Sequence, residues 1–405
     1  MSIFKNHKIT VNHLMGFIPE GLLTHLSQTT QVDYYTKVLH GRKMFYLLMY
    51  GILAHEKLSQ RSLEDTFNDP VFKVLFHLDE QESVRRSSIS ERLSKIDPAF
   101  FKQAYECIYE QFADLYAPYE REKYHLIRVD STMVSESVGK LVEGMDNKRG
   151  KKAIKYSMGF DGLLPCQSEV FTAPGYGSED IALPQVVMNH VKKQAHHQNI
   201  YVLDRGLQST RNMDTFTQKD ITFVCRAKEN RKYVELASLI LTDQELDLGD
   251  TLLIKDAKVQ LYTGQTKKSK KETSYYQQTL VDQEFRMIVV ESKCDHKLYV
   301  FLTNDFKRSA NEIAQAYRRR WDIEVFFRFL KQELNMSHLI SLNKNGIQVM
   351  LYMILIVAMM VLIYKKANRL GYKTAKRRLA VEVRNLAIAM IVVRCGGNPN
   401  LMFKT

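Results

Sequence analysis

The segment Tyr317–Lys331 reads YRRRWDIEVFFRFLK, and its charged and aromatic residues are spaced as on a helix. At about 100° per residue, four of its polar side chains fall within about 60° of arc. They are Tyr317, Arg320, Glu324 and Lys331. One helix face therefore presents a carboxylate flanked by two cations and a phenol, while Asp322 and Glu333 point the opposite way.

The residues around this segment favour a packed helix over a purely exposed one. Ser309 and Glu312 form an S-x-x-E capping box, so we expect a helix from Ser309 to about Met336. An exposed Arg320–Glu324 pair at i,i+4 spacing is the simplest explanation of the charges, and it is worth only ~0.3–0.5 kcal/mol. Four aromatic neighbours indicate that the helix packs firmly. They are Trp321, Phe326, Phe327 and Phe329.

Two aspartates directly follow hydrophobic strand candidates. The stretch Tyr124–Val129, YHLIRV, ends at Asp130. The stretch Asn199–Leu203, NIYVL, ends at Asp204. A carboxylate at a strand end is rigidly held at the rim of a sheet, where a metal site is easily built. Because Asp also closes strands by forming turns, neither residue identifies a site by itself.

The other patterns predict a mixed α/β core with helices at both ends. Helical spacing occurs at 42–58, 60–67, 85–96, 99–116 and 180–195. Further strand candidates are 155–160, 167–173, 221–226, 251–254, 258–262, 285–290 and 297–302. A basic stretch in the last group contains Lys267, Lys268, Lys270 and Lys271, and it fits a solvated loop as well as a DNA contact.

One apolar run, Val349–Tyr364, is 16 residues long and is closed by Lys365 and Lys366. A membrane span needs ~20 residues, whereas apolar runs of ~10–14 are more often buried core helices. We therefore expect a helix buried in a large core, with a membrane span as the alternative.

Composition places the chain among globular proteins. It has 405 residues, 45% hydrophobic and 25% charged, which excludes disordered, collagen-like and low-complexity chains and indicates several structural units. With 58 Lys plus Arg against 45 Asp plus Glu, the net charge of +13 favours a polyanionic partner such as nucleic acid. The five scattered cysteines contain no C-x-x-C pair, which argues against a disulfide framework and a Cys-based zinc site and favours a reducing compartment.

The four-residue face matches a known signature. Its spacing resembles the Y-x2-R-x3-E-x6-K signature of DDE transposases of the insertion sequence 4 family, and all four positions fit. Asp130 in V-D-S-T and Asp204 in L-D-R-G are similar to the first and second acidic motifs of that family. The resemblance covers about residues 124–364 well and the N-terminal helices loosely.

The resemblance implies a fold and a set of roles. The fold is a ribonuclease-H-like catalytic core, and Asp130, Asp204 and Glu324 are the catalytic residues that bind two divalent metal ions. Tyr317, Arg320 and Lys331 contact the DNA backbone. The partners implied are terminal inverted repeats, target DNA and a second copy of the chain in a synaptic homodimer. The protein is then expected in the prokaryotic cytoplasm, associated with the nucleoid.

The chemistry of the three residues agrees with this interpretation. Three carboxylates without a thiolate or histidine cluster suit Mg²⁺ or Mn²⁺, which prefer oxygen ligands. Two such ions ~3.5–4 Å apart can activate an attacking oxygen and stabilise a leaving one in phosphodiester displacement. The expected reaction is cut-and-paste transposition, in which water first frees a 3′-hydroxyl that then attacks target DNA.

We expect four regions along the chain. They are a helical DNA-binding region at 1–120, a catalytic core at 121–228 and 306–364, a β-rich insertion at 229–305, and a basic helical region at 365–405. Three other functions stay open: a nuclease that cuts without joining, an inactive transposon-derived DNA-binding protein or regulator, and a membrane protein. The intact carboxylates argue against the regulator.

Overall fold

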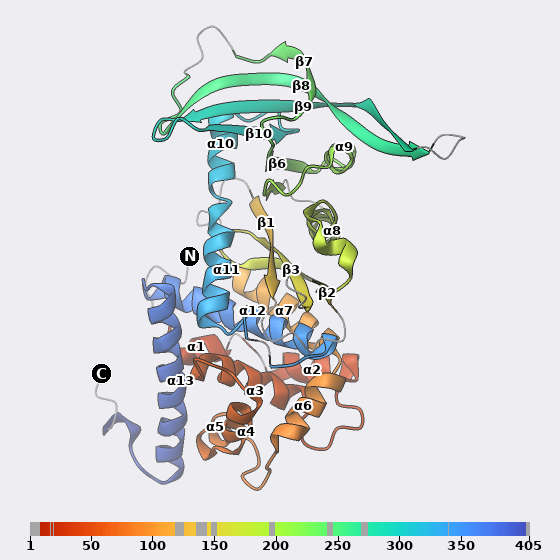
Figure 1. Ribbon diagram of the computed structural model, residues 1–405. Helices are drawn as coiled ribbons and strands as arrows, with labels where there is room; N and C mark the ends of the chain where they lie inside the picture. Colours follow the sequence, from red (N-terminus) through yellow and green to blue (C-terminus); the bar gives the residue numbers. More distant parts are fainter. Residues whose placement is uncertain are drawn as a thin grey trace.

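The structure is a computed structural model that describes residues 9–16, 18, 20–117, 125–134, 144–146, 152–193, 199–240, 246–268, 274–338 and 340–401. Figure 1 shows three levels: a β-rich layer with a long hairpin at the top, a mixed α/β core in the middle and a helical unit below. Lys270 and Lys271 of the predicted basic stretch lie outside the described residues.

One mixed sheet of ten strands runs through the core and the upper layer. The core strands are β1 (His125–Val134), β2 (Met145–Asp146), β3 (Lys152–Phe160), β4 (Pro165–Phe171), β5 (Asn199–Leu203) and β6 (Thr222–Arg226). Their order is β4-β3-β1-β5-β6, with β1, β5 and β6 parallel and with β3 and β4 antiparallel to their neighbours. This is a ribonuclease-H-like arrangement, so the predicted fold class is confirmed.

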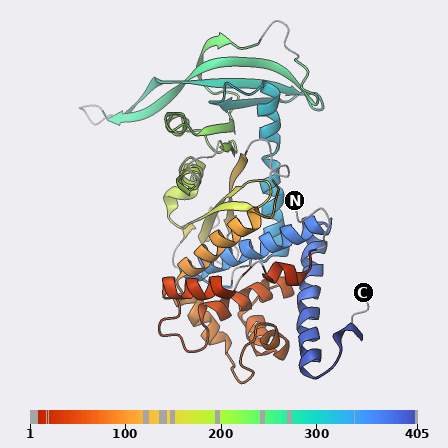
Figure 2. The same cartoon turned by 180° about the vertical axis from the view of Figure 1, so that it is seen from behind.

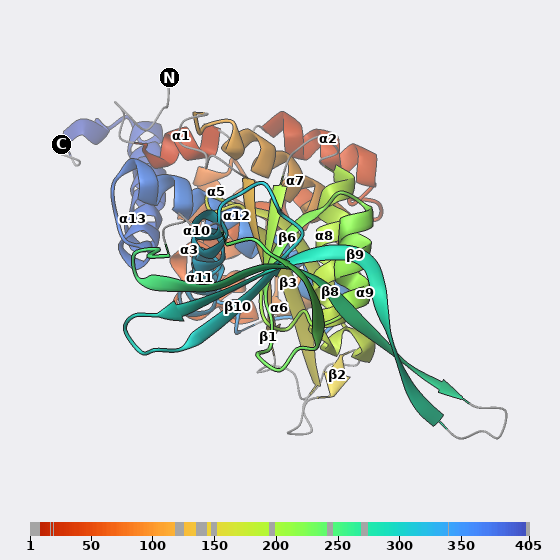
Figure 3. The same ribbon diagram turned by 90° about the horizontal axis from the view of Figure 1, so that it is seen from above.

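The upper layer continues the same sheet. It consists of β7 (Tyr233–Ser238), β8 (Thr251–Lys268), β9 (Ser274–Ser292) and β10 (Leu298–Thr303). Strand β10 pairs with core strand β6 on one side and with β9 on the other. Seen from above in Figure 3, the β8–β9 hairpin extends well beyond the core.

The prediction of separate strands at 251–254 and 258–262 is wrong, because β8 runs through both. Asp256 lies between the two candidates, and its side chain is buried. Arg286 of β9 donates two hydrogen bonds to the Asp256 carboxylate, at 2.8 and 2.6 Å. This pair lets a charged residue lie inside the strand.

Helices cover both faces of the core sheet. On one face, α8 (Glu179–Lys193) and α9 (Thr210–Gln218) bury their apolar residues against β1, β5 and β6. On the other face lies α10 (Ala310–Arg318), which is followed by α11 (Trp321–Glu333). Short 3₁₀ helices lie at Pro174–Gly177 and Pro399–Leu401.

The helical unit is formed by both ends of the chain. Its N-terminal helices are α1 (Val11–Gly16), α2 (Glu20–Thr30), α3 (Gly41–Ala54), α4 (Gln60–Asn68), α5 (Pro70–Leu75), α6 (Arg86–Lys95) and α7 (Pro98–Ala113). Several begin at side-chain caps: the Ser59 side chain accepts the Ser62 N–H at α4, and the Asp97 side chain accepts the Ala99 N–H at α7, just before Pro98. The C-terminal helices are α12 (Lys344–Ala367) and α13 (Tyr372–Arg394).

Helix α12 contains the apolar run and lies inside the molecule. Every residue from Val349 to Tyr364 is buried. Among the described helices it alone is long and apolar enough to cross a membrane, yet 94% of its most apolar window is buried within the protein. Figure 2 shows it running beside α7, where the Tyr352 and Tyr105 rings are 5.9 Å apart. The prediction of a buried core helix is confirmed.

Candidate active site

Asp130 and Asp204 lie at the same edge of two adjacent parallel strands. The last parallel pair between β1 and β5 is Val129 with Leu203, and each aspartate is the next residue of its chain segment. Carboxyl ends of parallel strands meet at one edge of a sheet, which is where open α/β folds build their sites. The structure therefore brings together two residues that are far apart in the sequence.

The prediction that the first strand ends at Asp130 is wrong. Strand β1 continues to Val134, because its second half pairs with β3 and places Asp130 opposite Met158. Asp130 is therefore held within a strand. Its Oδ1 accepts a hydrogen bond of 2.7 Å from the Ser131 N–H, which fixes the orientation of the carboxylate.

Glu324 joins the two aspartates through Arg320. The Arg320 Nη2 atom is 2.5 Å from Glu324 Oε1, and Nη1 is 3.8 Å from Asp130 Oδ2. Arg320 Nε is 3.7 Å from Asp204 Oδ1 and, within the described part of the chain, has no hydrogen-bond partner. One guanidinium thus lies among all three predicted catalytic carboxylates.

The electrostatics of this cluster favour additional positive charge. Burial, with smaller contributions from the nearby Asp204 and Glu179 charges, raises the pKa of Asp130 to about 7. The Ser131 N–H and the Arg320 guanidinium act in the opposite direction without restoring the usual value. A bound cation would favour the ionised carboxylate.

Tyr317 and Lys331 lie on either side of Arg320 and Glu324 along the chain. The Tyr317 ring packs on Phe301 at 4.8 Å, and it lies 5.7 Å from the Arg320 guanidinium carbon. Burial raises the pKa of Tyr317 to about 12. The Lys331 ammonium donates to the Thr132 hydroxyl, two residues beyond Asp130. Burial lowers the pKa of Lys331, while the charge of Asp130 opposes this shift.

The single predicted helix from Ser309 to about Met336 is instead two helices, α10 and α11. At the junction, Arg320 N donates to Tyr317 O at 3.0 Å and Asp322 N donates to Arg319 O at 3.1 Å. These i,i+3 bonds tighten one turn between the helices. The junction positions Arg320 at the start of α11, where it reaches all three carboxylates.

A buried arginine that the sequence pattern did not single out holds this junction. Arg128 is fully buried in β1. It donates to Leu126 O at 2.7 Å, to Arg319 O at 3.2 Å and to the Asp322 carboxylate at 3.1 Å. The polar residue inside the YHLIRV strand candidate was its only signal in the sequence.

Arg128→Met is expected to slow DNA cleavage about a hundredfold without removing any predicted metal ligand. Loss of its hydrogen bonds removes the link between β1 and both the Arg319 carbonyl and the Asp322 carboxylate. A displacement of ~1 Å at a reacting group can slow the reaction by about a hundredfold. Cleavage rates and thermal unfolding would be measured beside Arg211→Met, an exposed arginine on α9. Unchanged cleavage by Arg128→Met would show that the junction does not position the site.

A second residue that the sequence pattern did not single out lies beside Asp130. Glu179, the first residue of α8, accepts a hydrogen bond of 2.9 Å from the Ser131 hydroxyl and pairs with Lys155 at 2.8 Å. A Cβ atom added at Gly206 would lie 2.8 Å from the Glu179 Cβ, too close for any side chain. The glycine of L-D-R-G is therefore needed where the Asp204 loop passes α8.

The donor set fits a hard divalent cation, although no tight ligand cluster is formed. No group of three or more His, Cys, Asp or Glu in the described part of the chain is close enough to hold an ion. The three carboxylates nevertheless converge on one cationic group, and they offer only oxygen donors. The oxygen donors of Asp130, Asp204 and Glu324 therefore suit Mg²⁺ or Mn²⁺ in their chemistry.

Comparison with known proteins extends this picture. The probable transposase of insertion sequence element IS5377 from Geobacillus stearothermophilus is 29% identical over 150 residues, covering 37% of this chain and 35% of that protein. The chain thus spans about a third of the length of that relative. The putative transposase of element IS4SA from Synechocystis is 23% identical over 335 residues, covering 81% of this chain and 82% of that protein.

A solved structure shares the fold. It is the cryo-EM structure of a piggyBac transposase synaptic complex with hairpin DNA, with a TM-score of 0.50 and 11% sequence identity. The likeness covers 97% of this chain and 83% of that one. The family described as transposase DDE domain matches residues 121–360, which contain the whole cluster around Arg320. Since this match spans more than half of the sequence, the chain belongs to the transposase DDE domain family.

Proposed function

We propose that this protein is a DNA transposase that cuts DNA at the ends of its element and joins the freed 3′ ends to target DNA. The observation that carries the proposal is the arrangement of Asp130, Asp204 and Glu324 around one guanidinium. Three elements far apart in the sequence place these carboxylates together, in a chain of the transposase DDE domain family.

Asp130, Asp204 and Glu324 are the residues that would hold two Mg²⁺ or Mn²⁺ ions. When bound, such ions activate the attacking oxygen and stabilise the leaving oxygen of a phosphodiester. The protein contributes rigidity: β1 and β5 fix the two aspartates within one sheet, and α11 carries the glutamate. This assignment follows from the donor chemistry and the convergence of the side chains.

Arg320 would have different binding partners in the metal-free and the metal-bound site. Without metal, it forms ion pairs with the three carboxylates that surround it and offsets part of their negative charge. With metal bound, its fork of N–H donors becomes available for a DNA phosphate, which it matches in geometry. Lys331 and Tyr317, which flank it along the chain, would hold the same backbone.

The DNA partners would be the terminal inverted repeats and the target. The chain's net charge of +13 supports a polyanionic partner. The structural neighbour was solved as a synaptic complex with hairpin DNA, and we propose by analogy that two copies of this chain bring two DNA ends together. We place this reaction in the prokaryotic cytoplasm.

A strand-transfer assay tests this function. The purified protein would be incubated with a duplex that carries the flank of its own gene, a supercoiled plasmid and Mg²⁺. We expect the labelled 3′ end to appear joined to the plasmid, and we expect no joining in EDTA. Cutting without joining would identify a nuclease. Specific binding without cutting would identify a DNA-binding regulator, and the proposed function would fail.

A further inference from the structure

The first two residues of helix α8, Glu179 and Asp180, contact the segments that carry both predicted catalytic aspartates. Glu179 accepts a hydrogen bond of 2.9 Å from the hydroxyl of Ser131, the residue that follows Asp130. Asp180 accepts hydrogen bonds from the segment that follows Asp204. One dipeptide therefore connects two parts of the predicted active site that lie far apart in the sequence.

Asp180 holds the chain that leaves Asp204. Its Oδ1 atom accepts the backbone N–H groups of Gln208 and Ser209, each at 2.7 Å. Its carbonyl oxygen accepts the side-chain amide of Asn212 at 2.6 Å, which ties the first turn of α9 to α8. Hydrogen bonds to an ionised acceptor are stronger than those between neutral groups, so this carboxylate restricts the turn that follows Asp204.

Glu179 makes the corresponding contact beside Asp130. The Ser131 hydroxyl that donates to Glu179 also lies 2.7 Å from the Ser157 hydroxyl of β3, and the Ser131 N–H donates to the Asp130 carboxylate. The buried Lys155 of β3 pairs with the other oxygen of Glu179 at 2.8 Å. Ser131 therefore links the position of Glu179 to the orientation of Asp130.

Helix α8 is a rigid support for these contacts. Its apolar residues are buried against the core sheet. Near its C-terminal end, His190 lies 2.9 Å from the Tyr201 hydroxyl of β5, and both side chains are buried. At its N-terminal end, a Cβ atom added at Gly206 would lie 2.6 Å from the Glu179 Cγ, so the aliphatic part of Glu179 packs directly on the chain after Asp204. Packing on the core therefore holds the dipeptide in place.

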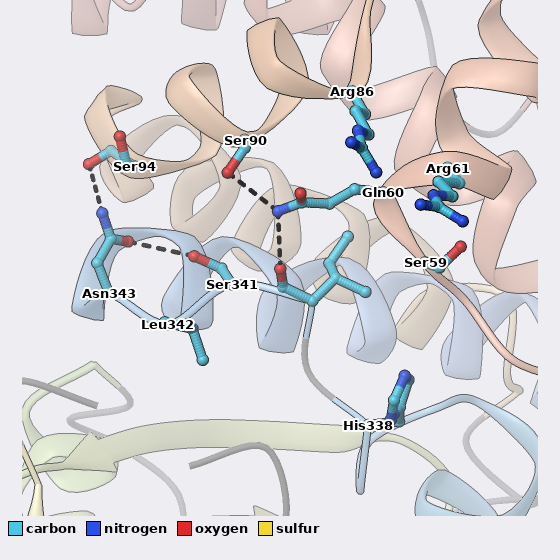
Figure 4. A pocket seen from close by; sticks show the side chains of 11 residues that line it. Ser59, Gln60, Arg61, Arg86, Ser90, Ser94, His338, Ser341, Leu342 and Asn343 are labelled. Atoms are coloured by element: carbon cyan, nitrogen blue, oxygen red, sulfur yellow. Dashed lines mark hydrogen bonds between the residues drawn. The ribbon is translucent and has the colours of Figure 1, made fainter. Parts of the chain in front are cut away.

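The third carboxylate, Glu324, is held by other parts of the molecule. The first turn of its helix, α11, is bonded to β1. The segment after α11 is bonded to α4 and α6 at the wall of a cavity of about 630 Å³, which Figure 4 shows. There Gln60 donates to the Ile340 carbonyl at 3.1 Å, and Asn343 donates to the Ser94 carbonyl at 2.9 Å. The α8 dipeptide is thus not what holds Glu324, and loss of its contacts would displace the aspartates relative to Glu324.

We propose that Glu179 and Asp180 are positioning residues that set the separation of Asp130 and Asp204, and thereby the affinity of the site for a divalent cation. The inference rests on the proposed function and deepens it. Neither residue would contact the cation, because each acts through the backbone next to one aspartate. Groups that orient metal-binding residues in this way commonly contribute about 10–100-fold to metal affinity.

The test is a titration of the metal-free protein with Mn²⁺ alone, using wild type, Asp180→Ala and Asp180→Asn. Trp321 is the only tryptophan of the chain and lines the same cavity as Asp204, so quenching of its fluorescence reports binding at this site. Loss of the electron paramagnetic resonance signal of free Mn²⁺ gives the number of ions bound. We expect Asp180→Ala to bind Mn²⁺ at least about tenfold more weakly than the wild type. Asp180→Asn keeps an oxygen that can accept both N–H groups and should recover most of this loss.

The control is Asp97→Ala, which makes the same change at the start of α7, where the Asp97 side chain accepts a backbone N–H at 2.8 Å. It should bind Mn²⁺ like the wild type. Ser131→Ala tests the Glu179 contact separately, since it removes the hydroxyl and keeps the N–H that donates to Asp130. This variant should also bind Mn²⁺ more weakly than the control. Thermal unfolding without metal checks the folding of each variant, and Ser131→Ala carries the test if Asp180→Ala does not fold.

The inference and the proposed function fail in different ways. If Asp180→Ala and Ser131→Ala bind Mn²⁺ as tightly as Asp97→Ala, the positioning role is overturned and the proposed function stands. An equal loss in Asp180→Ala and Asp180→Asn would overturn it too, because the charge and not the hydrogen bonds would then matter. Wild-type protein that binds Mn²⁺ but neither cuts nor joins DNA would remove the proposed function alone. Wild-type protein that binds no Mn²⁺ would overturn both.

Discussion

Glu324→Gln should reduce the rate of DNA-end cleavage on the order of a thousandfold and leave DNA binding intact. The substitution keeps the size of the side chain but removes the negative charge that a divalent cation needs. Residues that act as one catalytic unit commonly cost this much or more when one is removed. Single-turnover cleavage in Mg²⁺ and a DNA-binding titration in Ca²⁺ or EDTA would be measured on the same preparations.

The control for this variant is Glu333→Gln, which makes the same change on the same helix at a residue outside the cluster. It should cut DNA at the wild-type rate. The proposed catalytic unit also includes Asp130 and Asp204. Double variants that combine Glu324→Gln with Asp130→Asn or Asp204→Asn should therefore cut DNA only slightly more slowly than the single variants. If Glu324→Gln cuts DNA at a rate near that of Glu333→Gln, the three residues do not form the catalytic centre.

Leu355→Asp is expected to prevent the protein from folding. Leu355 lies in the middle of α12 and is fully buried. An unpaired carboxylate there costs several kcal/mol, added to the loss of apolar burial, against a total stability of about 5–15 kcal/mol for a typical domain. The milder Leu355→Ala should cost about 2–5 kcal/mol through the cavity that it leaves. Urea unfolding followed by circular dichroism measures both effects.

The comparison variant is Val381→Asp, an exposed position on the neighbouring helix α13. It should fold and unfold like the wild type, since exposed substitutions usually change stability by less than ~0.5 kcal/mol. The same experiment decides between a core helix and a membrane span. Wild-type protein that stays in solution only with detergent, together with a well-folded Leu355→Asp variant, would contradict the burial of α12.

The sequence revealed the parts of the site that depend on local spacing. Asp204 follows a short apolar strand, and Glu324 shares a helix face with Arg320, so both could be identified without coordinates. Asp130 and Asp204 come together because β1 and β5 are adjacent and parallel. The α/β pattern of the sequence suggests such a pairing, and the structure shows which two strands pair.

The parts that were missed depend on contacts between distant segments. Arg128 reads as an ordinary strand residue, and only the packing of β1 against the α10–α11 junction gives it the Arg319 carbonyl and the Asp322 carboxylate as acceptors. The same junction splits a helix that propensity alone would leave continuous. Likewise, the strand candidates at 251–254 and 258–262 are one strand because Asp256, which lies between them, pairs with Arg286 on the next strand of the hairpin.

The most direct test of the central claim is strand cleavage at the flanks of the gene by wild-type protein and Asp204→Asn, each in Mg²⁺ and in EDTA. We expect a 3′-hydroxyl end from the wild type in Mg²⁺, and no product above background in the other three reactions. Cleavage by Asp204→Asn at the wild-type rate, or cleavage by the wild type in EDTA, would contradict a metal-dependent centre formed by Asp130, Asp204 and Glu324.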